Sequence, residues 1–269
     1  MATIKTNHKI TWNYEVEGEG RDLLFIHGWG VDHRIWRQQT KYFSDKYRVI
    51  SVDLPGHGAS DWHSDLTLSE IAEDLVLVLE SLSCRDVDVV GSSLGGMVAL
   101  KSFEIDPAMF GSLIFVGSLP RFSKTPEYPY GVDVQQMLKV ARQLQMNFPD
   151  VLHSFFKSMF TLEERQSRRF KMMERFRQES GPPNVHAITE YLEIIFDEDL
   201  RSILMYVNVP VAFFYGAGDV ICPPAAMDQM RKLVPAAKYQ CFEKAGHFPF
   251  LIEAEPFNNE LESFLRVRE

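Results

Sequence analysis

The pentapeptide Gly91-Ser92-Ser93-Leu94-Gly95 matches the pattern G-x-S-x-G, in which the central serine can act as a nucleophile. An apolar run at 87–90 precedes it and predicts a buried strand, while residues 96–100 favour the start of a helix. Glycines are needed beside the serine in so sharp a turn, because larger side chains would collide there. The turn exposes the hydroxyl and points the free N–H groups of the helix N-terminus at the reacting atoms. We therefore predict that Ser93 is a nucleophile.

A serine nucleophile needs a general base, and the base needs an acid that orients it. We predict that His247 is the base, because it follows the last expected strand, and loops at strand ends carry catalytic groups in open α/β sheets. Asp219 is the predicted acid because it follows the apolar run at 209–216. The loop at 117–120 is the other suitable place for the acid, but it contains no carboxylate. In the resulting triad His247 takes the proton of Ser93 and later returns it to the leaving group.

The negative charge that develops on the substrate oxygen needs two hydrogen-bond donors, which form an oxyanion hole. The first is the backbone N–H of Leu94, the residue after the nucleophile. The second should come from the loop after Ile26, and we expect it to be the Trp29 N–H. Backbone placement therefore matters more here than side-chain identity.

Other polar residues near expected strand ends are assigned structural roles. His27 precedes a glycine and His57 lies between two, so both are interpreted as turn-stabilising. Asp53 ends a strand but precedes the serine in the chain, and is interpreted as structural. The remaining histidines show no metal-ligand spacing, and no G-x-G-x-x-G motif follows a strand. We therefore predict neither a metal nor a dinucleotide cofactor.

The elements that must position these residues alternate between strands and helices, which predicts an α/β fold with a mostly parallel sheet flanked by helices. From about residue 118 to 204 this alternation stops, and the sequence becomes helical and rich in Met, Phe and Arg. We predict an α/β core, residues 1–117 and 205–269, with a helical cap, residues 118–204, inserted into it. The expected strands are 10–17, 23–26, 47–54, 87–90, 113–116, 209–216 and 238–242, and the expected helices include 67–83, 96–105, 224–233 and 256–267.

Composition limits the possible partners. The 269 residues carry a net charge of -9, which argues against nucleic-acid binding. The three cysteines are scattered, as expected for reduced thiols in the cytoplasm. The N-terminal residues lack the apolar segment of a signal peptide, and no run of about 18 apolar residues predicts a membrane span. We expect a cytoplasmic monomer.

The predicted cap is basic within this acidic chain. Residues 135–180 hold nine Lys and Arg against five Asp and Glu, so the segment is +4 and the remainder of the chain is -13. Such an island can recruit an acidic partner through its local field, although a solvated helix face is an equally good interpretation. A helical wheel places Arg168, Lys171 and Arg175 on one face and Arg165 and Arg169 nearer the apolar side. That apolar side gathers Leu162, Phe170, Met173 and Phe176.

The motifs of the core together resemble the α/β-hydrolase superfamily over nearly the whole chain outside the cap. They are HGWG at 27–30, VDLPGHGAS at 52–60, SSLGG at 92–96, YGAGD at 215–219 and KAGHFPF at 244–250. Within that superfamily the chain is similar to the pimeloyl-[acyl-carrier protein] methyl ester carboxylesterases of biotin synthesis. The residues that carry this narrower likeness are Arg34-Ile35-Trp36, the Pro-Arg-Phe-Ser and Glu-Tyr-Pro pieces within 118–130, Tyr191-Leu192-Glu193-Ile194 and Asp199-Leu200-Arg201.

This resemblance implies hydrolysis of the methyl ester of a pimeloyl chain on acyl carrier protein, an acidic partner held by arginines of the cap. Arg165 and Arg169 fall where two such arginines are expected, with Arg168, Lys171 and Arg175 as further candidates. Asp150 and Ser154 occupy the positions of two other arginines, and Ser92 replaces a tryptophan. The implied contacts of the acyl chain are Trp29, Ser93, Leu94, His247 and the segment Phe155, Phe156, Lys157, Ser158 and Met159.

Periodicity leaves two interpretations of Phe155, Phe156 and Met159, which fit an acyl channel or the interior of the cap. Alternative activities also remain open. One is a broad esterase for short acyl chains or a hydrolase of C–C bonds. Another is a binding protein that has the fold without catalysis, although the complete set of triad residues argues against it.

Overall fold

The computed structural model describes residues 2–180 and 182–266. Within them, eight strands form one sheet in the order β1-β2-β4-β3-β5-β6-β7-β8. β1 and β2 pair antiparallel with their neighbours, while all pairs from β4 to β8 are parallel. The strands are β1 (Ala2–Lys5), β2 (Thr11–Glu17), β3 (Arg21–Ile26), β4 (Tyr47–Val52), β5 (Val87–Ser92), β6 (Phe110–Val116), β7 (Val211–Gly216) and β8 (Lys238–Phe242).

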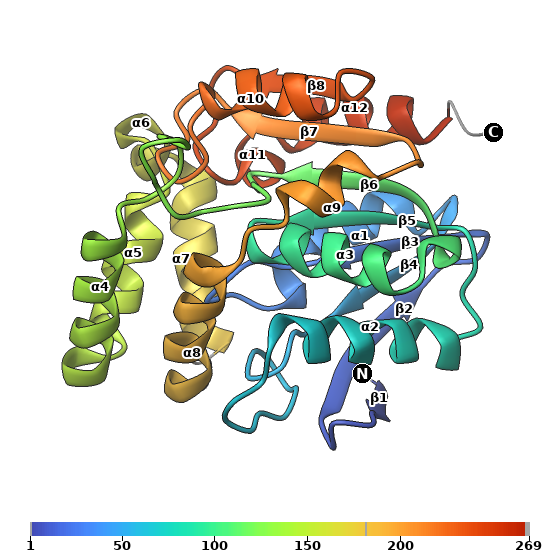
Figure 1. Ribbon diagram of the computed structural model, residues 1–269, viewed down its shortest axis with the longest axis horizontal. Coiled ribbons are helices and arrows are strands. Elements are labelled where there is room, and N and C mark those ends of the chain that lie inside the picture. Colours follow the sequence, from blue (N-terminus) through green and yellow to red (C-terminus); the bar gives the residue numbers. More distant parts are fainter. Residues whose placement is uncertain (1, 181, 267–269) are drawn as a thin grey trace.

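Helices cover both faces of this sheet. Figure 1 shows α2 and α3 in front of it and α1 behind it. Each face has its own hydrophobic cluster, so successive residues of β3 serve opposite sides: Leu24 and Ile26 pack on the α2 and α3 side, Leu23 and Phe25 on the α1 and α12 side. The core helices are α1 (Arg37–Phe43), α2 (Leu68–Ser81), α3 (Leu94–Ile105), α10 (Ala226–Leu233), α11 (Pro249–Ile252) and α12 (Ala254–Arg266), with short 3₁₀ turns at His33–Trp36 and Pro107–Met109.

The structure confirms the α/β class and most of the expected elements. Thr67 caps α2 through the capping box that its spacing from Glu70 predicts. Sequence patterning missed β1, whose side chains are mostly exposed and which is joined to β2 through its backbone. The final expected helix is α12, and its predicted last residue, Val267, lies outside the described residues.

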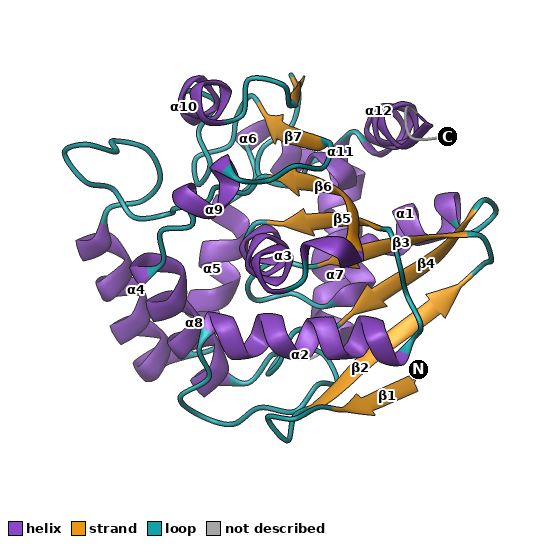
Figure 2. Cartoon of the chain, turned by 45° about the vertical axis from the view of Figure 1, so that its right-hand side comes forward, coloured by secondary structure: helices purple, strands orange, loops and turns teal. Residues whose placement is uncertain are grey.

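Among the described residues, six helices lie between β6 and β7, in the region that we predicted as a cap. Figure 2 shows β5, β6 and β7 pointing toward them, so they lie over the carboxyl ends of the central strands. The last of them, α9, contacts α3 and α10 of the core. None of the helices in the described ranges combines the length and apolar character needed to cross a bilayer. The six are α4 (Val134–Asn147), α5 (Asp150–Ser158), α6 (Leu162–Gln166), α7 (Arg168–Ser180), α8 (Val185–Asp197) and α9 (Arg201–Met205).

The chain passes from β5 to α3 through a single residue. Ser93 has φ of 52° and ψ of -117°, a combination that L-residues rarely adopt. The turn is so close to its neighbours that a Cβ on Gly95 would lie 2.5 Å from the carbonyl oxygen of Ile26 and 2.6 Å from that of His27. Glycine is therefore needed at position 95, because a side chain there would collide with the backbone at the end of β3.

We expect Gly95→Ala to lower the free energy of unfolding by about 1–3 kcal/mol, because backbone must move to admit the methyl group. Urea unfolding followed by circular dichroism measures the change. Gly28→Ala is the matched control, since its added Cβ would meet nothing closer than 3.2 Å. Equal losses in the two variants would contradict this account of Gly95.

Candidate active site

Ser93 stands at the start of α3, which orients the helix N-terminus toward the site. Its N–H donates to the carbonyl oxygen of Val116 (2.9 Å), and its own carbonyl accepts from the Ser118 hydroxyl (2.7 Å). These two bonds tie the turn to β6 and the loop after it. Among the described hydrogen bonds, neither the Leu94 N–H nor the Trp29 N–H, the two predicted oxyanion donors, has a protein acceptor. Both donors are therefore available to a bound group.

His247 and Asp219 form a buried pair. The Nδ1 of His247 lies 2.8 Å from Oδ2 of Asp219, and both side chains are almost completely buried. The other carboxylate oxygen, Oδ1, accepts from the backbone N–H groups of Ile221 (2.8 Å) and Cys222 (2.9 Å). With Asp219 accepting at Nδ1, the neutral imidazole leaves Nε2 without a proton, which is the form that a general base requires.

A tightly packed wall lies behind this pair. Gly117, with φ of 52°, approaches the imidazole so closely that an added Cβ would lie 3.1 Å from Nδ1 of His247. The Cys222 thiol donates to the Gly117 carbonyl at 3.0 Å, and burial raises the pKa of this thiol well above its usual value. Cys222 is thus an inert packing group beside the pair, because a thiol with so high a pKa is not ionised at neutral pH.

His27 and His57 hold the loop that carries Trp29, as the sequence predicts. Nε2 of His27 accepts from the Leu54 N–H (2.9 Å), and its Nδ1 lies 2.8 Å from the Gly28 carbonyl oxygen. Nε2 of His57 accepts from the Gly30 N–H (3.1 Å). Burial lowers the pKa of His27 and brings that of His57 to about 3. Both rings are therefore neutral, and each is used as an acceptor by a backbone N–H.

A second buried histidine–aspartate pair exists but serves the scaffold. Nδ1 of His33 lies 2.7 Å from Asp53, which also accepts from the Asn13 amide and from the Ala59 N–H. Burial by itself would raise the pKa of Asp53, but the hydrogen bond from His33 holds it well below its usual range. Asp53 thus braces the turn after β4, and the cavity described next contains neither member of this pair.

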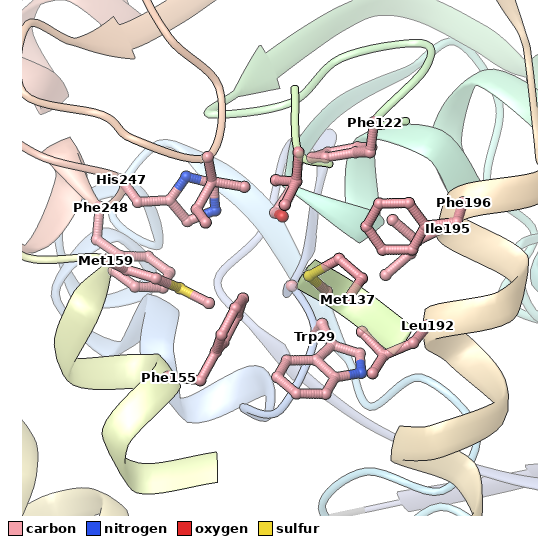
Figure 3. A pocket seen from close by; sticks show the side chains of 14 residues that line it. Trp29, Phe122, Met137, Phe155, Met159, Leu192, Ile195, Phe196, His247 and Phe248 are labelled. Atoms are coloured by element: carbon pink, nitrogen blue, oxygen red, sulfur yellow. The ribbon is translucent and has the colours of Figure 1, made fainter. Parts of the chain in front are cut away.

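An apolar cavity connects Ser93 with His247. Figure 3 shows His247 and Phe248 on one side of it and Ile195 and Phe196 of α8 on the other. No charged Asp, Glu, Lys or Arg side chain belongs to its described lining. The full lining is Gly28, Trp29, Ser93, Phe122, Val132, Met137, Phe155, Met159, Leu192, Ile195, Phe196, Ile221, His247 and Phe248.

The segment from Phe155 to Met159 divides between cavity and cap interior. Phe155 and Met159 line the cavity, and the Phe155 ring meets Trp29 edge-on at 5.2 Å. Phe156 instead packs against Phe160 and Phe248, while Lys157 and Ser158 are exposed. The expected acyl contacts of Phe156, Lys157 and Ser158 are therefore not brought to this cavity, because successive residues of α5 point in different directions.

The sequence did not predict most of the residues that line the cavity on the side across from His247. Leu192, Ile195 and Phe196 recur at the i, i+3, i+4 spacing of one helix face, but such a stripe predicts burial without saying what it covers. Phe248, next to His247, and Ile221, two residues after Asp219, were lining residues close in the chain to the predicted triad.

The helical wheel was wrong about Leu162. It treats 162–176 as one helix, whereas the chain breaks at Ser167, whose hydroxyl accepts from the Phe170 N–H (3.0 Å) and starts α7. Leu162 therefore lies in α6 and is 74% exposed, while Phe170 and Met173 are buried. The side chain of Phe176 lies outside those that the structure describes.

The basic side chains of α6 and α7 have different surroundings. Arg168, Lys171 and Arg175 are exposed on α7. Arg169 is also exposed, and its guanidinium donates to the carbonyl of Ile252 in α11. Arg165 is half-buried, with Nε donating to the Phe160 carbonyl at 3.0 Å. Of the two arginines that the resemblance selected, Arg165 thus also bonds within the cap and Arg169 joins the cap to α11 of the core, while the other three form the exposed basic face.

Two groups of described side chains bring three potential metal-ligand atoms within 4.8 Å of one another. They are Asp219, Cys222 and His247, and Asp32, His33 and Asp53. In the first, the imidazole and carboxylate bond to each other and the thiol donates to a carbonyl; in the second, His33 bonds to Asp53. Hydrogen bonds account for these arrangements, and the absence of a metal stays a prediction.

Comparison with known proteins shows which family this fold belongs to. Residues 23–254 match the family model described as alpha/beta hydrolase fold. The chain belongs to the α/β-hydrolase fold family. This α/β-hydrolase is 31% identical over 243 residues to a pimeloyl-[acyl-carrier protein] methyl ester esterase from Nitrosomonas europaea, covering 90% of this chain and 95% of the relative. A protein of the same name from Aliivibrio fischeri is 30% identical, with 94% and 96% covered.

The fold also matches a solved esterase from Exiguobacterium antarcticum. The TM-score is 0.92 at 25% identity, and the match covers 98% of both chains. The family and these named relatives support a hydrolase of the esterase type, and they confirm the resemblance that the motifs indicate.

The depressed pKa of His57 predicts a loss of stability in acid. Between its usual value of 6.5 and about 3, the unfolded chain binds a proton that the native chain does not. The free energy of unfolding must therefore decrease as the pH falls through this window, by about 2 kcal/mol between pH 7 and pH 5.

Urea unfolding of the wild type and of His57→Gln at pH 7, 6 and 5 measures this effect. Glutamine keeps an acceptor for the Gly30 N–H but does not titrate, so its stability should depend less on pH. Parallel pH dependences in the two proteins would show that His57 is not the responsible group.

Proposed function

We propose that this α/β-hydrolase is a serine carboxylesterase with Ser93, His247 and Asp219 as its triad. The observation that carries the proposal is the buried His247–Asp219 pair, 2.8 Å apart, whose imidazole lines the same apolar cavity as Ser93. Ser93 stands in a strained turn at the N-terminus of a twelve-residue helix. A nucleophile, a base with an orienting acid and adjacent free N–H groups are the parts that acyl transfer needs.

The proposed reaction proceeds in two steps. His247 takes the proton of the Ser93 hydroxyl as Oγ attacks the ester carbonyl carbon, and the N–H groups of Leu94 and Trp29 stabilise the resulting oxyanion. The imidazolium then gives its proton to the departing alkoxide, which leaves as an alcohol. Water, deprotonated by His247, attacks the acyl-enzyme and releases the carboxylic acid and free Ser93. Asp219 keeps the imidazole in the required tautomer throughout.

The substrate that we propose is the methyl ester of a pimeloyl chain carried by acyl carrier protein, and the alcohol released is methanol. The printed names of the relatives at 30–31% identity support this substrate. An apolar cavity without a charged Lys or Arg among its described lining residues suits a methylene chain and a neutral ester better than a free carboxylate. The exposed Arg168, Lys171 and Arg175 offer a complementary surface to an acidic carrier.

We expect Ser93→Ala to lower kcat/KM for p-nitrophenyl butyrate by at least about 10³-fold, because no other group can form the acyl-enzyme. A fluorophosphonate probe should label the wild type at Ser93 and leave the variant unlabelled. Ser92→Ala is the matched control: its buried hydroxyl has no described partner, so activity should stay within about twofold. Esterase activity that survives Ser93→Ala would end the proposal.

The double variant Arg168→Glu/Lys171→Glu tests whether the exposed basic face binds acyl carrier protein. We expect KM for the carrier-borne methyl ester to rise about tenfold and the kinetics for p-nitrophenyl butyrate to stay unchanged, because the exposed face meets only the carrier. Lys5→Glu/Lys9→Glu, at two exposed positions near the edge of the sheet, controls for the same change in total charge.

Two results would point away from the carrier-borne substrate. One is hydrolysis of free short esters or of C–C bonds with no action on the carrier-borne ester. The other is failure of the gene to restore growth without biotin in a strain that lacks the pimeloyl ester esterase.

A further inference from the structure

The loop that carries His247 is held by the cap. The His247 N–H donates to the carbonyl oxygen of Met159 (3.0 Å), at the end of α5. The preceding N–H, that of Gly246, donates to Oε1 of Glu164 in α6 (2.8 Å). Two successive backbone donors at the proposed base are thus bound by the cap segment 159–164 and by no acceptor in the sheet.

Glu164 is fixed between the start of α6 and this loop. Its side chain is almost fully buried, and its second oxygen, Oε2, accepts from the Thr161 N–H. The Thr161 hydroxyl in turn accepts from the Glu164 N–H at 3.2 Å, which completes a capping box. Hydrogen bonds to a buried carboxylate are strong, and loss of the acceptor would leave the Gly246 N–H unsatisfied. A capping glutamate usually serves its own helix, whereas Glu164 also binds a distant loop.

The same segment reaches the loop that carries Asp219. Gly218, the residue before Asp219, donates its N–H to the carbonyl oxygen of Ala245 at 2.9 Å. Gly218 also lies so close to Thr161 that an added Cβ would be 2.5 Å from the Thr161 methyl group. Cap, histidine loop and acid loop therefore pack as one unit, in which the buried carboxylate of Glu164 joins the start of α6 to the histidine loop.

We propose that Glu164 is a positioning residue that couples the placement of the cap to the orientation of His247. Glu164 does not belong to the described lining of the cavity, so it acts through the Gly246–His247 backbone and not on substrate. The role rests on the proposed esterase function, since it concerns the base of that reaction. Small displacements of a base are costly to catalysis, because proton transfer requires hydrogen-bond geometry.

The test compares Glu164→Gln and Glu164→Leu with the wild type, using p-nitrophenyl butyrate, which needs no carrier. Glutamine keeps the shape but only one accepting oxygen, so we expect kcat to fall about tenfold with KM within about twofold. Leucine removes both acceptors, and kcat should fall about a hundredfold. Thermal unfolding establishes that each variant is folded at the assay temperature. Glu163→Gln is the matched control, because it makes the same charge change on an exposed neighbour.

The outcomes separate this role from a purely structural one. A lower Tm with unchanged kcat in Glu164→Gln would overturn the proposal, even if Glu164→Leu fails to fold. Equal losses in Glu163→Gln would also overturn it, since they would indicate a general charge effect. A wild type without esterase activity or fluorophosphonate labelling would refute the proposed function and this role together. An active wild type with an equally active Glu164→Gln would refute the role alone.

Discussion

The conformation of Ser93 is the constraint on which the architecture depends. A strand must become a helix within one residue, which places Ser93 at a φ of 52° and brings Gly95 against the backbone of β3. Such a conformation persists only where its surroundings enforce it. Here β5 lies between β3 and β6, and hydrogen bonds with Val116 and Ser118 hold the turn from outside. The remaining groups of the site come from loops at the same end of the parallel strands.

Buried histidines show how partners, not residue type, decide function. His27 and His57 accept hydrogen bonds from backbone N–H groups, and burial lowers the pKa of each, so they remain neutral supports of the Trp29 loop. His33 pairs with a carboxylate but lies outside the cavity. His247 alone among these four lies beside Ser93 in the cavity and also has a carboxylate partner. The base that we propose must be a buried histidine that has a carboxylate acceptor for its ring N–H and that also reaches the cavity.

The helices over the strand ends have two distinct surfaces. Toward the sheet they contribute Phe155, Met159 and the face of α8 to an apolar cavity, and outward α7 presents an exposed basic face. Between these surfaces, Glu164 and Met159 bind the loop of His247. In the proposed enzyme, the region that selects the substrate therefore also holds the base in place.

The sequence by itself determined the fold class and the candidates Ser93, Asp219 and His247, because strand periodicity, glycine spacing and chain order are local signals. The sequence could not determine which helix faces pack against one another. Patterning shows that Leu192 and Phe156 are apolar, but only the packing of α8 and α5 puts the first in the cavity and the second in the cap interior. Glu164 reads locally as a helix cap, and its bond to Gly246, 82 residues away in the chain, exists only once the tertiary structure has formed.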